Sequence, residues 1–162
     1  MDERLGLEAR GFLFLGALFC TAACGSETAG PAPDLPRGWE TASAIQDLHQ
    51  TACNGLPYDG TPEAMTASTS ERSIHVLYEP AHFRCAQALQ GFVKSGKGSV
   101  DVLVQPIDMN PASVAKCDCL YGVDMKIPAD SGEYAVSVYR RWDHKSGADG
   151  PLQIGSESVT VP

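Results

Sequence analysis

The cysteines are the most reactive side chains in this 162-residue chain, because a thiol can carry a lipid, bind a metal, exchange electrons or form a disulfide. There are six of them: Cys20, Cys24, Cys53, Cys85, Cys117 and Cys119. In a strand, the odd-numbered positions from 117 to 127 would share one face, and they are two thiols, Tyr121 and three apolar residues. We therefore expect the thiols of Cys117 and Cys119 to point inward.

The first 23 residues have the character of an export signal. Arg4 and Arg10 precede the apolar stretch 11–23, which ends in small residues. Thr21-Ala22-Ala23-Cys24 resembles the lipobox of bacterial lipoproteins, in which small residues precede a cysteine that is acylated and becomes the mature N-terminus. The resemblance implies a signal peptide at 1–23, a bilayer anchor on Cys24, and a membrane-anchored protein that faces the periplasm or the exterior. Plain secretion is the alternative.

The four remaining cysteines favour two structural disulfides, because they are an even number in an oxidising compartment. A bridge between Cys117 and Cys119 would close a small strained ring. Each is therefore expected to pair with a distant partner, either Cys85 or Cys53, and the sequence does not decide which. Loops of this length predict that each bridge contributes about 3 to 4 kcal/mol to stability.

A metal or redox site is the competing interpretation of the same thiols. Cys117 and Cys119 could hold a soft ion such as copper(I) together with His75, His82, Met109 or Met125. The Cys-x-x-Cys spacing typical of zinc is absent. A redox pair needs exposure, whereas the alternation predicts burial. We therefore expect neither a metal nor a cofactor.

No catalytic constellation stands out in the sequence. The stretch 91–98 nearly fits a phosphate-binding loop, but Gly98 replaces the hydroxyl that would bind magnesium. The four histidines accompany no nucleophile signature. Arg140-Arg141-Trp142 could anchor a partner, since Arg and Trp are frequent in binding hot spots. Nucleic acid is disfavoured as a partner, because 20 acidic residues face 12 basic ones. We do not expect an enzyme.

The segment before the strands is predicted to contain a linker and one helix. Residues 24–38 are rich in Gly, Pro and small polar residues, which indicates a flexible linker. Ala42, Ile45, Leu48 and Ala52 recur at helical spacing behind a capping box at Ser43 and Gln46, which predicts a short helix near 44–53. The stretch 55–71 lacks a clear period and is expected to be a loop.

The rest of the chain alternates with a period of two. This pattern predicts strands at 73–79, 81–93, 100–105, 117–127, 133–141 and 152–161. Short strands without helical crossovers between them indicate an antiparallel sandwich. We expect one β-sandwich domain at 39–162.

The start of the strand at 133–141 carries a recognisable pattern. Gly132-Glu-Tyr134-Ala-Val136-Ser-Val138 resembles the tyrosine corner of immunoglobulin-like folds, in which a tyrosine hydroxyl bonds an upstream turn. With Phe83-Arg-Cys85 and Cys117-x-Cys119, the stretch 74–141 looks like small exported bacterial β-sandwich domains of uncharacterised function. The resemblance implies a mainly β, antiparallel immunoglobulin-like sandwich, and no activity.

These patterns together predict an exported, lipid-anchored, non-catalytic protein with a binding or structural role at the cell envelope. Its loops would meet an envelope protein or a glycan. Two alternatives remain open. One is an exported metal-binding or thiol-redox module that uses Cys117 and Cys119, and the other is a hydrolase inhibitor that presents an exposed loop.

Overall fold

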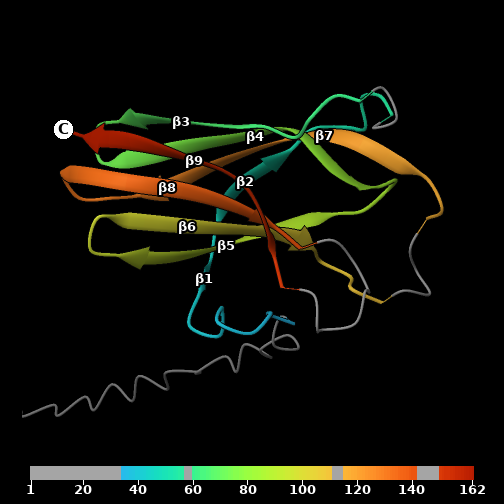
Figure 1. Ribbon diagram of the computed structural model, residues 1–162, viewed down its shortest axis with the longest axis horizontal. Coiled ribbons are helices and arrows are strands. Elements are labelled where there is room, and N and C mark those ends of the chain that lie inside the picture. Colours follow the sequence, from blue (N-terminus) through green and yellow to red (C-terminus); the bar gives the residue numbers. More distant parts are fainter. Residues whose placement is uncertain (1–33, 57–59, 111–114, 142–149) are drawn as a thin grey trace, which may run out of the picture. The chain divides into compact units, whose positions relative to one another are not determined.

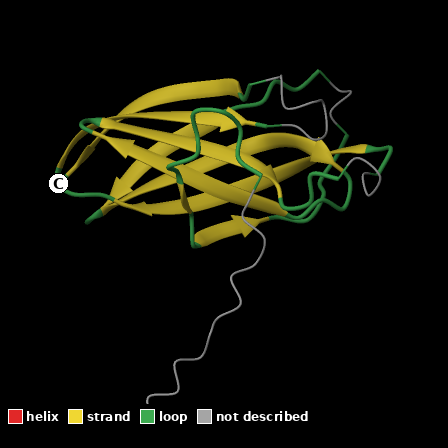
Figure 2. Cartoon of the chain, turned by 90° about the horizontal axis from the view of Figure 1, so that it is seen from below, coloured by secondary structure: helices red, strands yellow, loops and turns green. Residues whose placement is uncertain are grey.

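A computed structural model describes residues 34–56, 60–110, 115–141 and 150–162 of the protein. The predicted signal peptide, Cys24 and most of the predicted linker lie outside these ranges. Within them the chain forms nine strands and no helix, arranged in two sheets (Figure 2). The expectation of a mainly β protein is therefore confirmed.

The two sheets share a mostly antiparallel topology (Figure 1). The larger sheet has the order β1 (Ser43–Ala44), β5 (Leu89–Gly96), β6 (Ser99–Pro106), β8 (Gly132–Arg140), β9 (Leu152–Val161). The smaller sheet has the order β2 (Asp47–Gln50), β7 (Asp118–Pro128), β4 (Ser73–Arg84), β3 (Met65–Ser70). One pair, β6 and β8, is parallel, so the prediction of a fully antiparallel arrangement is wrong there. After β6 the chain crosses to the smaller sheet as β7. It then returns to the larger sheet as β8, which runs in the same direction as β6.

The inner faces of the two sheets meet in one hydrophobic core. Alternate residues of the longer strands supply it, as the period of two predicts. The larger sheet contributes a row of valines, and the smaller sheet contributes aromatic and aliphatic side chains: Val100, Val102, Val104, Val136, Val138, Ile74, Val76, Tyr78, Phe83 and Ile127. Burying one such side chain fully contributes roughly 1.5 to 3 kcal/mol. The core therefore fixes which face of every strand is internal.

The helix predicted near 44–53 is wrong, because this segment forms β1 and β2. The chain pairs first with β5 in the larger sheet and then with β7 in the smaller one, so it changes sheets between Ala44 and Asp47. Ile45 and Leu48 both pack against the core, which reproduces a helix-like spacing of apolar residues. Gly91 on β5 permits this approach. A Cβ at that position would lie 2.8 Å from a methyl of Leu48, which is too close for two carbon atoms.

Two more strand predictions need correction. The predicted strand at 81–93 is divided between the end of β4 and the start of β5. β4 continues through Pro80, where its register with β7 shifts between Tyr78 and Ala81. A proline is tolerated at such an irregularity, because the missing N–H removes no regular ladder bond. The expected loop at 55–71 contains β3, a strand at the edge of the smaller sheet.

The segment 34–42 packs on the outer face of the larger sheet. Trp39 is buried there with Phe92 and Leu103, and its ring meets Tyr139 edge-on at 5.5 Å. The Lys94 ammonium lies 4.3 Å from the centre of the Trp39 ring. The last five residues of the predicted linker, 34–38, therefore belong to a segment that is held against the domain.

The strands run between two opposite ends of the domain (Figure 1). At the hairpin end lie the turns between β3 and β4, between β5 and β6 and between β7 and β8, together with the C-terminus. At the disulfide end, β2, β4, β6 and β8 end, and β7 and β9 begin. All four cysteines of the domain lie at the disulfide end.

Candidate functional site

Two disulfides brace the start of β7. Cys53 pairs with Cys119, and Cys85 pairs with Cys117, with Cα–Cα distances of 5.7 and 5.4 Å. The prediction that Cys117 and Cys119 each take a distant partner is confirmed, and the structure decides the pairing. Cys119 is buried in the core, whereas Cys117 is exposed because it precedes β7. The expectation that both thiols point inward thus holds for Cys119 and not for Cys117.

An ion pair reinforces the same end. The guanidinium of Arg84, the last residue of β4, lies 2.6 Å from the carboxylate of Asp118, the first residue of β7. The hydroxyl of Tyr121 donates to the Arg84 carbonyl at 3.0 Å. These contacts join β4 to β7 beside the Cys85–Cys117 bridge. The disulfide end is therefore held by covalent and polar contacts together.

A second polar cluster lies between the sheets near this end. Arg140 on β8 points inward, and its Nη1 lies 2.7 Å from Oε2 of Glu63, with only 11% and 13% of the two side chains exposed. Glu63 also accepts hydrogen bonds from the Tyr78 hydroxyl and, at 3.1 Å, from the His82 backbone N–H. Burial, and next the nearby Glu63 carboxylate, raise the pKa of Tyr78 far above its usual value. Tyr78 therefore stays a neutral donor.

The alternation along β8 contains a signal for this cluster that was not used to predict it. Val136, Val138 and Arg140 alternate along β8, so the phase that buries the valines also buries the guanidinium. A buried cation needs an anionic partner, because an unpaired one is costly to desolvate. The pattern could have indicated a partner for Arg140, but not that Glu63 from the segment before β3 would supply it.

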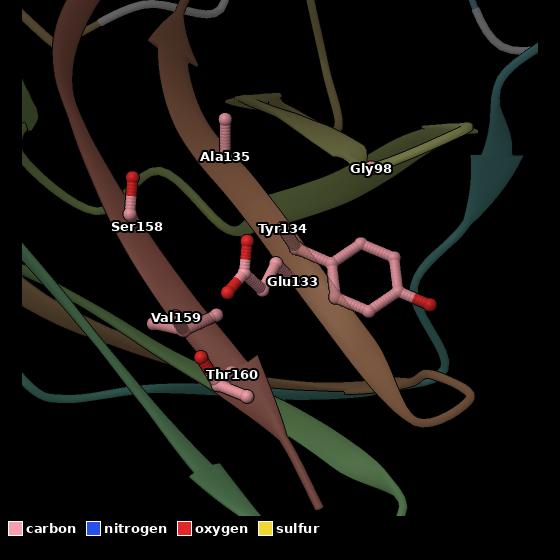
Figure 3. Close-up of a pocket in the computed structure, with 7 residues that line it drawn as sticks. All are labelled: Gly98, Glu133, Tyr134, Ala135, Ser158, Val159 and Thr160. Atoms are coloured by element: carbon pink, nitrogen blue, oxygen red, sulfur yellow. The ribbon is translucent and has the colours of Figure 1, made fainter.

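The hydroxyl of Tyr134 donates to the backbone carbonyl of Asp130, four residues upstream in the turn before β8, at 3.1 Å. Tyr134 is among the residues that line an open hollow (Figure 3), whose volume is about 410 Å³. The other residues that line it are Gly98, Glu133, Ala135, Ser158, Val159 and Thr160. Neither histidine nor cysteine is among them, so the hollow offers a carboxylate and hydroxyls without a paired nucleophile and base.

A more apolar hollow of about 500 Å³ lies where β1 passes into β2. Ile45, Val93, Ile127 and Pro128 supply its apolar walls, and Asp47 and Lys126 supply opposite charges. Ser43 and Gln46 complete its polar lining, which includes no histidine or cysteine. The hollow lies at the edge of the two sheets, where the chain changes from β1 in one sheet to β2 in the other.

The candidate metal ligands do not converge. Met125 is buried in the core, and His75 lies in β4 opposite Ser68 and Lys126 in the neighbouring strands. Across the ranges that the structure describes, no three His, Cys, Asp or Glu side chains form a group that could hold a metal ion. The sulfur atoms of Cys117 and Cys119 are both engaged in disulfides. In this disulfide-bonded form, the two thiols that the copper(I) alternative would use are not free.

No family model, curated protein or solved structure matches this chain. Within the described residues, no helix combines the length and hydropathy that a membrane crossing would require.

Trp142, from the predicted Arg140-Arg141-Trp142 anchor, lies outside the described residues. The two arginines instead make internal contacts, Arg140 with Glu63 and Arg141 with Asp34. Both disulfides and the Arg84–Asp118 ion pair lie together at the disulfide end.

Proposed function

We propose that this chain is an exported, lipid-anchored protein whose two-sheet domain has a non-catalytic binding or structural role at the cell envelope. The observation that carries the proposal is the pair of disulfides, Cys53–Cys119 and Cys85–Cys117. Stable disulfides form in oxidising compartments outside the cytoplasm. The lipobox-like sequence before Cys24 supplies the route of export and the anchor.

The domain is proposed to be a variant of the immunoglobulin-like architecture. The Tyr134 hydroxyl bond to Asp130 supports this assignment, since it joins an early residue of a late strand to the turn before it. The parallel pairing of β6 with β8 departs from the antiparallel sheets of that architecture. The assignment concerns architecture alone and implies no activity.

A binding or structural role suits the distribution of polar groups. Two groups of largely buried polar side chains bond internally: Glu63 meets Arg140 and Tyr78, and Arg84 meets Asp118. Such pairs stabilise a fold, and neither hollow is lined by a histidine or a cysteine that could serve as base or thiol nucleophile. A redox role for Cys117 and Cys119 would require opening two bridges that connect neighbouring strands.

The test is the processing and acylation of a Cys24→Ala variant. The variant should remain unprocessed by the lipoprotein peptidase and carry no acyl chain, as read by gel mobility and mass spectrometry. Cys20→Ala is the matched control, because it removes a cysteine four residues earlier and should leave processing intact. Mass spectrometry of non-reduced peptides from wild-type membranes should identify both disulfides. A Cys24→Ala protein that stays processed and membrane-bound would refute the lipid anchor.

A further inference from the structure

Three large exposed apolar side chains lie at the disulfide end. Leu56 follows the bridge residue Cys53, Ile107 follows β6, and Leu152 begins β9. Their exposed fractions are 54%, 59% and 55%. In the part of the chain that the structure describes, the remaining exposed large apolar residue is Leu77 in the middle of β4, and its exposed fraction is lower, at 41%. Single exposed leucines are ordinary, but three at one end of a domain form a candidate contact surface.

The chain also enters the domain at this end. The backbone carbonyl of Asp34 accepts hydrogen bonds from Gln105 Nε2 at 3.0 Å and from Arg141 Nη1 at 2.5 Å. Gln105 lies at the end of β6 and Arg141 follows the end of β8. Buried Trp39 holds the segment after Asp34 on the outer face of the sheet. The position at which a tether would join the domain is therefore fixed at the disulfide end.

Chain length then limits which end of the domain can face the bilayer. Nine residues separate Cys24 from Asp34, and a fully extended chain of that length reaches at most roughly 36 Å. The strands between the two ends are themselves up to 12 residues long, or about 40 Å. A lipid on Cys24 therefore brings the disulfide end to the membrane more readily than the hairpin end.

We propose that the disulfide end is a lipid-contacting surface, and that Leu56, Ile107 and Leu152 enter the interfacial layer of the leaflet that holds the anchor. The inference rests on the proposed function, because the acyl chains on Cys24 hold this end near the bilayer. The contact is apolar, because the surface residues are aliphatic and the chain carries a formal net charge of -8, which does not favour anionic headgroups. A zwitterionic bilayer is the expected partner.

The test is hydrogen–deuterium exchange of the acylated protein in phosphatidylcholine vesicles, compared with Cys24→Ala protein in solution without vesicles. Peptides around Ile107 and Leu152 should exchange about tenfold more slowly when the protein is anchored, the effect of burying roughly half of one aliphatic side chain. The turns at the hairpin end should be unchanged. An anchored Ile107→Ser/Leu152→Ser variant should lose the protection, whereas Leu77→Ser, the matched control, should keep it.

The possible results separate the inference from the proposed function. If mass spectrometry finds no acyl chain on Cys24, the proposed function and the inference both fail. If Cys24 is acylated and the disulfide end exchanges as fast as in solution, the inference alone fails. Protection at the hairpin end would overturn it as well. Protection that appears on native membranes but not on pure lipid would assign this end to a protein partner, and would also overturn the proposal.

Discussion

Removing the disulfides one at a time should reveal how much each contributes to stability. The two variants are Cys53→Ala/Cys119→Ala and Cys85→Ala/Cys117→Ala, each of which removes both sulfur atoms of one bridge and leaves the other closed. Alanine is preferred to serine because Cys119 is completely buried and a hydroxyl there would lack a partner.

The connectivity allows the expected losses to be ranked. The bridged residues are 66 positions apart for Cys53–Cys119 and 32 apart for Cys85–Cys117, and the shorter loop lies inside the longer one. With the inner bridge closed, the outer bridge closes a ring of roughly 34 residues, which the chain-entropy model values at about 3.7 kcal/mol. Removing the inner bridge leaves one large ring and costs about 3 kcal/mol. Truncating buried Cys119 adds about 1 kcal/mol to the loss of the outer bridge.

The measurement is guanidinium unfolding of the oxidised proteins, followed by tryptophan fluorescence. The Cys53→Ala/Cys119→Ala variant should lose about 4 to 5 kcal/mol and the Cys85→Ala/Cys117→Ala variant about 3 kcal/mol, both large against the 5 to 15 kcal/mol typical of a domain. Reduced wild-type protein serves as the reference for loss of both. A Cys85→Ala/Cys117→Ala variant that costs more than the other pair, or either variant within 0.5 kcal/mol of wild type (about the error of the extrapolation), would refute the reasoning.

Three further predictions concern the tyrosines and the buried ion pair. Tyr134→Phe should lower the free energy of unfolding by about 1 kcal/mol in a denaturant titration, because its hydroxyl loses the bond to Asp130. Arg140→Met should cost about 3 to 5 kcal/mol in the same assay, since it leaves the Glu63 carboxylate buried without its cation. The raised pKa of Tyr78 means that stability is fully present below pH 10 and falls above it, by about 1.4 kcal/mol per pH unit, because the unfolded chain ionises first. Alkaline melting curves should show this fall, and Tyr78→Phe should reduce it.

Each of these predictions has a contrary outcome. An unchanged unfolding curve for Tyr134→Phe would remove the corner assignment. A Glu63→Leu/Arg140→Met double variant should recover much of the loss, because neither charge remains buried; no recovery would show that Arg140 acts through other contacts. Equal alkaline slopes for wild type and Tyr78→Phe would mean that the hydroxyl is not protected in the folded state.

Local patterns in the sequence predicted the second half of the fold well. The strands expected at 100–105, 117–127, 133–141 and 152–161 correspond to β6, β7, β8 and β9 within one or two residues at each end. β6, β7 and β8 lie inside their sheets, so burial of one face imposes a clear alternation on the sequence. The edge strand β3 has only Met65 and Ala67 among its apolar residues, so its alternation was too weak to predict.

The sequence by itself determined the alternation of the core strands and the even number of cysteines left for bridging. The tertiary structure decided the rest: the sheet change at Ile45, the parallel pair β6 and β8, the pairing of Cys53 with Cys119, and the approach of Glu63 to Arg140. Each of these depends on contacts between residues far apart in the chain. Gly91 shows the reason most clearly, because a missing side chain on β5 is what lets Ile45 and Leu48 approach that strand.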